Sequence, residues 1–420
     1  MALKAWAARQ QHRAQVDEIV LASGISGVTY GITINGKTIS FLTSGTVTAI
    51  GLQSGILSGL LASTEPEFLE ITWAAFGSGL RATAVTPGKP FTYTVAHSPA
   101  GSGFFDTSGV VTNLSPSDWG DGTNFDPSGL PASADTVTFD GKVQTPALWR
   151  LDALSGVQLS ALEVLSAFGG SEAQIGLSEL DEDGDYPQYR PRYLGISADV
   201  VNVGKDVGPG IRLFKMDQGN SGLEFNVYRT GTAKEQNRSA TTWKSLNTSG
   251  RANVYNGSMD FAILGNESGR LITLNVGPNG GAGSPRVNLG FGTDMASGTL
   301  NLSVGTVNLN GRLHTLNHKI GTGTIQGSGT ILDFNVNGGT VNHQGTGPIG
   351  SIELTAPGAT LNLGNAGPRL VISGTTTMKA GSSLQDAGFR GTYASGIILD
   401  GCTLPQVTIN LGPGRTLGVV

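Results

Sequence analysis

One phrase returns along the chain: Leu274-Asn275-Val276-Gly277, Val287-Asn288-Leu289-Gly290, Leu361-Asn362-Leu363-Gly364 and Ile409-Asn410-Leu411-Gly412. In each copy an Asn lies between two apolar residues, and a Gly follows. Partial copies are Leu300-Asn301-Leu302, Val307-Asn308-Leu309 and Val341-Asn342, and an earlier full copy is Val201-Asn202-Val203-Gly204. A phrase that recurs in this way indicates a stacked-strand repeat.

The phrase suits the short strands of a parallel β-helix. Apolar side chains that alternate toward the core flank each polar position. Asn side chains at the same place in successive turns can stack and hydrogen-bond to one another, and Gly supplies the positive φ of a sharp corner. We therefore predict a right-handed parallel β-helix. An antiparallel sandwich or a propeller is the alternative, which Asn310-Gly311 and Asn337-Gly338 favour because this dipeptide is typical of hairpins.

Composition agrees with a mainly β protein. The 420 residues include 64 Gly, 38% are hydrophobic and only 14% are charged. This chain is too apolar for disorder and too rich in Gly for a helical protein. The net charge is −5 and no block of basic residues occurs, so we expect no nucleic-acid partner. The single cysteine, Cys402, cannot form an intrachain disulfide, and we expect a small buried residue there.

The first residues do not resemble a secretion signal. Lys4, Arg9, His12 and Arg13 interrupt any apolar core before Gly24. No run approaches the about 18 apolar residues of a membrane helix, so we expect no membrane insertion and synthesis in a cytoplasm.

The region before the repeat divides into three parts. Residues 1–24 favour a helical arm, with Val16, Ile19 and Val20 at helical spacing. Residues 25–97 predict a small α+β domain with the order β-β-α-β-β-β, in which Asn35-Gly36 marks a hairpin. Residues 98–118 are Ser-, Gly- and Thr-rich and predict a linker.

The predicted α+β domain resembles a small domain of virion proteins from tailed bacteriophages. The resemblance rests on Ile32-Thr33-Ile34-Asn35-Gly36-Lys37, on Pro66-Glu67-Phe68-Leu69-Glu70-Ile71-Thr72-Trp73 and on Pro87-Gly88-Lys89-Pro90-Phe91. It implies a docking or assembly module without chemistry of its own, so that other virion proteins would bind through residues 1–97. It also implies that the protein is located in a virion.

Aromatic residues mark the start of the predicted β-helix. Trp119, Phe125, Pro131 and Phe139 lie in residues 119–145, which we expect to cap the open end of the first turn. The segment 119–140 resembles the opening segment of β-helical surface proteins such as autotransporter passengers. The β-helix itself would span 146–420, with irregular loops at about 181–260.

Candidate binding residues gather at the start of that irregular stretch. Asp181, Asp183 and Asp185 are carboxylates that could bind Ca²⁺, but they lack the spacing of an EF-hand, and a solvated loop is the simpler interpretation. The next charged and aromatic residues suit an interface or a sugar platform, unless they only cover the side of the solenoid; they are Tyr186, Tyr189, Arg190, Arg192 and Tyr193.

Catalytic residues are not evident. The acids of the regular turns are scattered, and His314, His318 and His343 lack the spacing of a metal site on one strand. We therefore expect no catalytic residues, no cofactor and no enzymatic activity. The combined resemblances predict a structural component of a phage virion, a homotrimeric β-helical appendage. The alternatives are a tailspike that binds or cleaves a host surface glycan, and a bacterial surface adhesin.

Overall fold

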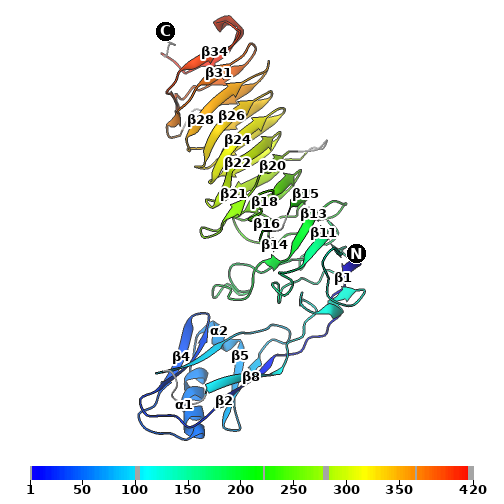
Figure 1. Cartoon of the computed structure of the whole chain (residues 1–420), viewed down its shortest axis with the longest axis vertical. Coiled ribbons are helices and arrows are strands. Elements are labelled where there is room, and N and C mark those ends of the chain that lie inside the picture. The colour runs from blue at the N-terminus through cyan, green and yellow to red at the C-terminus, as the bar shows by residue number, and fades with distance from the viewer. Residues whose placement is uncertain (1, 100–104, 221–222, 278–282, 365–366, 415–420) are drawn as a thin grey trace.

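The repeated phrase forms the rungs of a long solenoid. The computed structural model describes residues 2–99, 105–220, 223–277, 283–364 and 367–414. It is a parallel β-solenoid of about 12 turns with a small α+β domain at one end (Figure 1). The predicted mainly β fold is therefore confirmed, and the antiparallel sandwich and the propeller are not observed: within the described turns, strands pair in parallel with the turns before and after them.

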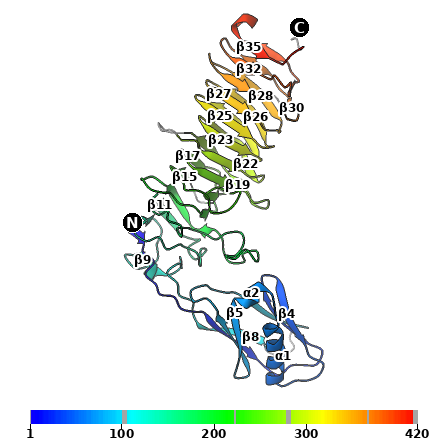
Figure 2. The same cartoon turned by 180° about the vertical axis from the view of Figure 1, so that it is seen from behind.

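Two sheets run along the solenoid, and Figure 2 shows them from behind. The first solenoid sheet contains β1 (Leu3–Trp6), β9 (Phe125–Asp126), β10 (Thr136–Phe139), β11 (Gln158–Val164), β13 (Ser197–Val203), β15 (Glu224–Val227), β17 (Arg251–Val254), β19 (Gly269–Arg270), β20 (Thr273–Val276), β22 (Thr293–Leu302), β24 (Arg312–His318), β26 (Thr330–Val336), β28 (Ile349–Leu354), β30 (Leu370–Ile372), β31 (Thr376–Met378), β33 (Gly391–Tyr393) and β34 (Ile397–Leu399). The second solenoid sheet contains β12 (Leu194–Gly195), β14 (Phe214–Asp217), β16 (Thr241–Lys244), β18 (Ser258–Phe261), β21 (Arg286–Leu289), β23 (Gly305–Leu309), β25 (Thr322–Gln326), β27 (Thr340–His343), β29 (Thr360–Asn362), β32 (Ser383–Gln385) and β35 (Thr408–Asn410).

Copies of the phrase in the first sheet form one continuous row of asparagines. The row is Asn202, Asn226, Asn253, Asn275, Asn301, Asn317 and Asn335. Each Nδ2 donates to the Oδ1 of the Asn in the turn before, over distances from 2.6 to 3.3 Å. Asn202 begins the row by donating to Glu163 at 2.8 Å. The predicted amide ladder is therefore confirmed.

The remaining copies form a separate row on the second sheet. Asn288, Asn308, Asn342, Asn362 and Asn410 belong to this sheet. Asn362 donates to Asn342 at 3.1 Å, and Asn410 donates to Gln385 at 3.1 Å. On both sheets the apolar residues next to these amides are mostly buried, as alternation along a strand requires. The single phrase of the sequence is thus two phrases, one for each side of the solenoid.

Aromatic rings close the first turn. Trp119, Phe125 and Phe139 are fully buried, with ring centroids 5.2 Å apart for Trp119–Phe125 and 6.0 Å for Trp119–Phe139. Pro131 is buried as well. Trp6 joins this cluster, 5.4 Å from Phe125, and its indole nitrogen donates to the carbonyl of Thr145. The cap therefore includes a residue from the first strand of the chain.

The predicted helical arm over residues 1–24 is wrong. That segment contains β1 and β2 (Val16–Leu21) instead. β1 lies between β9 and β10 at the base of the solenoid, and β2 lies in the α+β domain. Along β2 it is Ile19 and Leu21 that are buried, at the spacing of a strand. Pairing with distant strands therefore overrides the helix propensity of the local sequence.

The α+β domain is consequently inserted into the cap. The chain leaves the solenoid after β1, builds the domain and returns before Trp119 (Figure 1). The outgoing and returning chains are bridged, because the main chains of Arg13 and Leu114 exchange hydrogen bonds of 2.9 and 3.1 Å. The predicted linker over 98–118 is also wrong, since β8 (Phe105–Val111) lies there and pairs with β2. β8 is an edge strand with exposed residues, which is consistent with the few apolar residues in its sequence.

The predicted order of elements is confirmed within residues 25–97, where the short α2 is added, but the domain also includes β2 and β8 and so extends beyond those predicted bounds. One sheet holds β4, β3 and β7, and the other holds β5, β6, β2 and β8. Their bounds are β3 (Thr29–Ile34), β4 (Lys37–Leu42), β5 (Ile71–Phe76), β6 (Gly79–Ala84) and β7 (Thr94–Ser98). Two helices follow the first hairpin, α1 (Ala49–Leu61) and the short α2 (Pro66–Leu69). The short 3-10 turns at Gly122–Asn124 and Leu404–Gln406 lie in the cap and near the C-terminus.

Close packing explains one glycine of α1. A Cβ built on Gly55 would lie 2.4 Å from Cε2 of Phe41 on β4, far inside van der Waals contact. The nearest atoms to a Cβ on Gly51 are 3.5 Å away, which is an ordinary contact. Gly55 therefore allows the helix to approach β4, whereas Gly51 has no such role.

We predict opposite effects for Gly55→Ala and Gly51→Ala. Alanine improves helix propensity by up to about 1 kcal/mol over glycine. At Gly55 the clash with Phe41 outweighs this gain, and the free energy of unfolding should fall by on the order of 1–3 kcal/mol. At Gly51 it should rise or stay unchanged. Urea unfolding followed by helical circular dichroism measures both, and a stabilised Gly55→Ala would contradict the packing described here.

A buried histidine makes the solenoid sensitive to acid. His343 is 2% exposed, and its ring lies 5.7 Å from that of Phe334. Burial, together with the nearby charge of Arg390, lowers the pKa of His343 to about 4. The unfolded chain takes up a proton at its ordinary pKa of about 6.5. Stability is therefore fully present above about pH 6.5 and is lost as the pH falls toward about 4.

We expect His343→Leu to reduce this acid sensitivity. Between about pH 7 and about pH 4.5 the native chain should lose up to about 3 kcal/mol through His343, because each unit of pKa difference is worth about 1.4 kcal/mol. Leucine is apolar and cannot titrate, although it removes the hydrogen bond that Gly345 N–H donates to His343 Nδ1. Melting temperatures measured across this range test the expectation, with the more exposed His314→Leu as control. Parallel pH profiles for the native chain and His343→Leu would disprove it.

Candidate functional site at the base of the solenoid

A carboxylate of the α+β domain binds the irregular loop of the solenoid. Glu70 follows α2, and its side chain accepts hydrogen bonds from Tyr186, Arg190 and, at 3.3 Å, Tyr189. Lys89 of the same domain adds an ion pair of 2.6 Å. The Arg190 and Glu70 side chains are only 5% and 14% exposed, so this contact is shielded from water.

Arg190 makes further contacts with both the α+β domain and the solenoid. Its Nε donates to the carbonyl of Pro90 at 2.6 Å. Its guanidinium lies 4.4 Å from the ring centre of Tyr189 and 5.7 Å from that of Trp149 in the solenoid. A separate hydrogen bond also joins the α+β domain to the loop, from Asn35 Nδ2 to the carbonyl of Pro187 at 3.1 Å. The loop therefore clamps the α+β domain against the base of the solenoid.

The surroundings of Glu70 favour the ionised form of its carboxyl group. Burial raises the pKa of its carboxyl group, but the positive charge of Arg190 and hydrogen bonds from Lys89, Tyr186 and Arg190 outweigh this, and the pKa lies below its ordinary value. The clamp is thus fully charged above the ordinary glutamate pKa of about 4.3 and weakens as acid protonates Glu70.

Three of the predicted interface residues therefore have a partner inside the chain. Tyr186, Tyr189 and Arg190 contact Glu70, so these side chains are engaged with the α+β domain; their role toward an outside partner stays a prediction. Sequence reasoning missed Glu70, and nothing in its local pattern distinguishes it from other surface acids. Glu70, Lys89 and Pro90 all lie in segments on which the phage resemblance rests, but that resemblance assigned none of them a contact with the solenoid.

Arg192 and Tyr193 line a groove beside the clamp. The groove has a volume of about 700 Å³ and lies between residues 188–193, the ends of β14 and β16, and residues 266–268. Lys244 lies 4.4 Å from the ring centre of Tyr193 and pairs with Asp217 at 3.0 Å. Burial and a hydrogen bond with Glu267 raise the pKa of the Tyr193 hydroxyl.

The groove is suited to binding a polar ligand of no net charge. Arg192 and Lys244 balance the two anions of the groove, Asp217 and Glu267, next to an aromatic ring, while the third cation of the lining, Arg190, is paired with Glu70. Ligand hydroxyl groups could meet donors and acceptors at short range there. Of these residues, sequence reasoning missed Asp217 and Lys244. They are distant from Tyr193 in the chain, and only the stacking of β14 and β16 brings them together.

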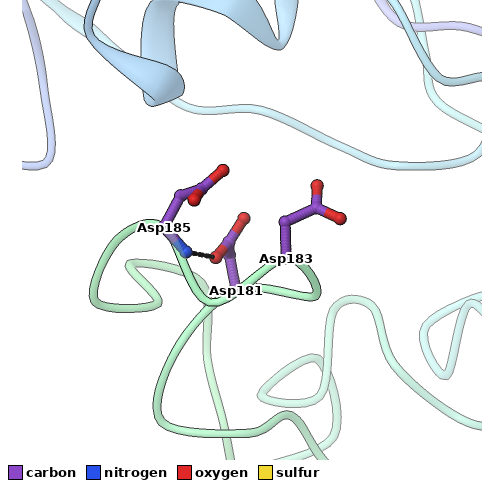
Figure 3. Close-up of side chains that lie close together, drawn as sticks. All are labelled: Asp181, Asp183 and Asp185. Atoms are coloured by element: carbon purple, nitrogen blue, oxygen red, sulfur yellow. Dashed lines mark hydrogen bonds between the residues drawn. The ribbon is translucent and has the colours of Figure 1, made fainter.

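The three acidic candidates form a tight turn. Oxygens of Asp181, Asp183 and Asp185 lie within 4.8 Å of one another, and their carboxylates stand on one side of the loop (Figure 3). Asp181 is buried and accepts the main-chain N–H of Asp185 at 2.6 Å, while the other two are exposed. The hydrogen bond gives Asp181 a role in shaping the turn.

The histidines do not meet in a shared site. His318 and His343 are buried in the solenoid, and His314 is half-exposed and lies 3.6 Å from Asp333. Within the described residues, the acidic turn is the only group of three or more potential metal ligands in mutual reach.

Comparison with protein-family models, with curated proteins and with solved structures finds no match. The resemblance of residues 25–97 to phage proteins therefore stays a prediction. In the described parts of the chain, no helix combines the length and the hydropathy that crossing a membrane requires.

We predict that Glu70→Gln loosens the α+β domain. The substitution keeps the shape of the side chain but leaves Arg190 buried without its counter-charge, at a cost of on the order of 3 kcal/mol. The connecting segments 7–15 and 112–118 should then be cleaved faster in limited proteolysis. Glu65→Gln is the control, because Glu65 pairs with Lys37 at an exposed position. This substitution should lower the stability by less than about 1 kcal/mol. Equal cleavage of both variants would contradict the clamp.

Proposed function

We propose that this protein is a rigid appendage that docks through its α+β domain and projects through its solenoid. The observation that supports this most is the insertion of the domain at the capped end of the solenoid, with the remaining turns extending away from it (Figure 1). Two connecting chains and the Glu70–Arg190 clamp hold the domain in one orientation. Such an arrangement suits a part that must stand out from a larger particle.

The docking role is supported by apolar side chains on the surface of the domain. Large hydrophobic residues are exposed there by 55 to 67%; they are Leu42, Ile50, Leu61, Leu69 and Val85. Exposed apolar groups that gather into one contiguous patch mark protein-binding surfaces. Together with the resemblance of residues 25–97, they support a structural role in a tailed-phage virion, where the partners are other virion proteins.

A second candidate function is binding of a host surface glycan. The groove beside Tyr193 favours it, because its balanced charges and aromatic ring suit a ligand rich in hydroxyl groups. Release of reducing ends from host polysaccharide is the measurement that separates cleavage of such a glycan from binding alone.

We expect labels to show the orientation of the chain on particles. Epitope tags placed in the exposed turn at Gly77 and after Gly401 should both be found in purified virions by mass spectrometry. In electron micrographs, gold bound to the second tag should lie farther from the particle than gold bound to the first. Recovery from a bacterial envelope alone, or the reverse order of labels, would refute the proposal.

A further inference from the structure

Two tyrosine rings are stacked on the surface of the solenoid. Tyr228 follows β15 and Tyr255 follows β17, and these strands pair in register up to Val227 and Val254. The N–H of each tyrosine donates to a carbonyl of the turn before, over 2.8 Å in both cases. The two side chains therefore leave the backbone at the same place in successive turns. Their ring centres are 5.0 Å apart, and the ring planes differ by 27°.

The stacked pair is partly open to solvent. Both tyrosines are half-buried. The same ladder of N–H bonds shows that Gly204 takes their place one turn earlier and Gly277 one turn later. Because glycine has no side chain, these two positions leave the outer faces of the rings uncovered. A small reagent from solution can therefore reach the pair.

The other tyrosines of the chain, which has eight in total, differ in burial or in their neighbours. Tyr30 and Tyr186 are only 0% and 2% exposed. Tyr186 and Tyr189 also stack, at 6.0 Å, but both hydroxyl groups donate hydrogen bonds to Glu70, and Tyr189 packs on the core of the α+β domain. Within the described residues, the remaining three have no ring contact with a second tyrosine; they are Tyr93, Tyr193 and Tyr393.

We propose that Tyr228 and Tyr255 are a site of oxidative modification, at which a one-electron oxidant joins two successive turns through a dityrosine bond. Each phenol gives one electron to the oxidant and its hydroxyl proton to water. The two phenoxyl radicals then form one carbon–carbon bond between the ring carbons next to those that carry oxygen. The hydrogens of these two carbons move to the oxygens and restore both hydroxyl groups. The pair thus loses two electrons and two protons in total.

The cross-link braces the solenoid close to its base. It closes the loop of chain between Tyr228 and Tyr255, which limits the conformations of the unfolded chain in the way that a disulfide does. The chain has a single cysteine and so cannot form an intrachain disulfide for this purpose. A bond between tyrosines instead needs only two rings that the stacking of β15 and β17 has already brought together.

The test uses the full purified chain at low protein concentration and a small oxidant, a photoexcited ruthenium complex with persulfate. Persulfate takes up the two electrons and becomes two sulfate ions. We expect the fluorescence of dityrosine to appear in chains that still run as monomers on a denaturing gel. Trypsin should release peptide 216–229 joined to peptide 252–270, with a mass that is two hydrogen atoms below their sum. The melting temperature of the cross-linked monomer should rise.

Tyr228→Phe and Tyr255→Phe should each abolish this joined peptide. Phenylalanine keeps the stacked ring but has no hydroxyl group to oxidise. Tyr193→Phe is the matched control and should cross-link like the native chain, because Tyr193 is half-buried as well but lies outside the pair. Circular dichroism spectra equal to that of the native chain show that the variants are folded.

A native chain that forms no dityrosine under these conditions would overturn the proposal. So would dityrosine that is found in dimers alone or between other tyrosines, or a joined peptide that persists in Tyr228→Phe. The virion test of the proposed function is independent of this one, since the cross-link is measured in the isolated chain.

Discussion

The structure depends on one constraint, that each turn must pair its strands with the turns on both sides. A strand in the middle of the solenoid has its backbone donors and acceptors bonded to its neighbours, so the register cannot slip without reversing which side chains face the core. This constraint places Leu274, Leu300 and Leu316 inside and the asparagines beside them outside. The amide ladders follow from the same register. They add hydrogen bonds along the axis at positions that the backbone has already aligned.

At the ends of the solenoid, the outermost turn has no further turn with which to pair its strands. At the base, β1 pairs with β10 on one side and with β9 in the opposite direction on the other, so the first rung has a neighbour. Trp6 and Trp119 then cover the apolar interior. Because β1 and β9 belong to the cap, the α+β domain between them is held by the cap itself. The Glu70–Arg190 contact fixes the same domain from a third point, on the loop before β12.

Much of this architecture could be predicted from local patterns. The Asn phrase indicated the solenoid, Trp119 and Phe139 indicated its cap, and the Asn35-Gly36 turn indicated the first hairpin of the domain. Local patterns failed where distant segments decide the outcome. Residues 3–6 and 16–21 are strands because β10 and β6 provide edges for them, and β8 pairs although Asp106 to Gly109 in its middle are polar or small. Successive asparagines of the first-sheet row are between 16 and 27 residues apart in the sequence. Because this spacing varies, no fixed repeat length distinguishes the asparagines of the first sheet from those of the second. Glu70 and Arg190 are 120 residues apart, and no pattern in the sequence pairs them.

The two-chain connection also determines how the molecule responds to torque. A domain on a single linker swivels freely about its bonds. Here the segments 7–15 and 112–118 run side by side and are joined at Arg13 and Leu114, so a rotation of the domain must twist both chains together. Twisting would pull on β1 and β9, which are hydrogen-bonded to each other in the cap. Sideways drag on the far end of the solenoid is therefore passed to the α+β domain as a turning moment instead of being absorbed by a loose joint.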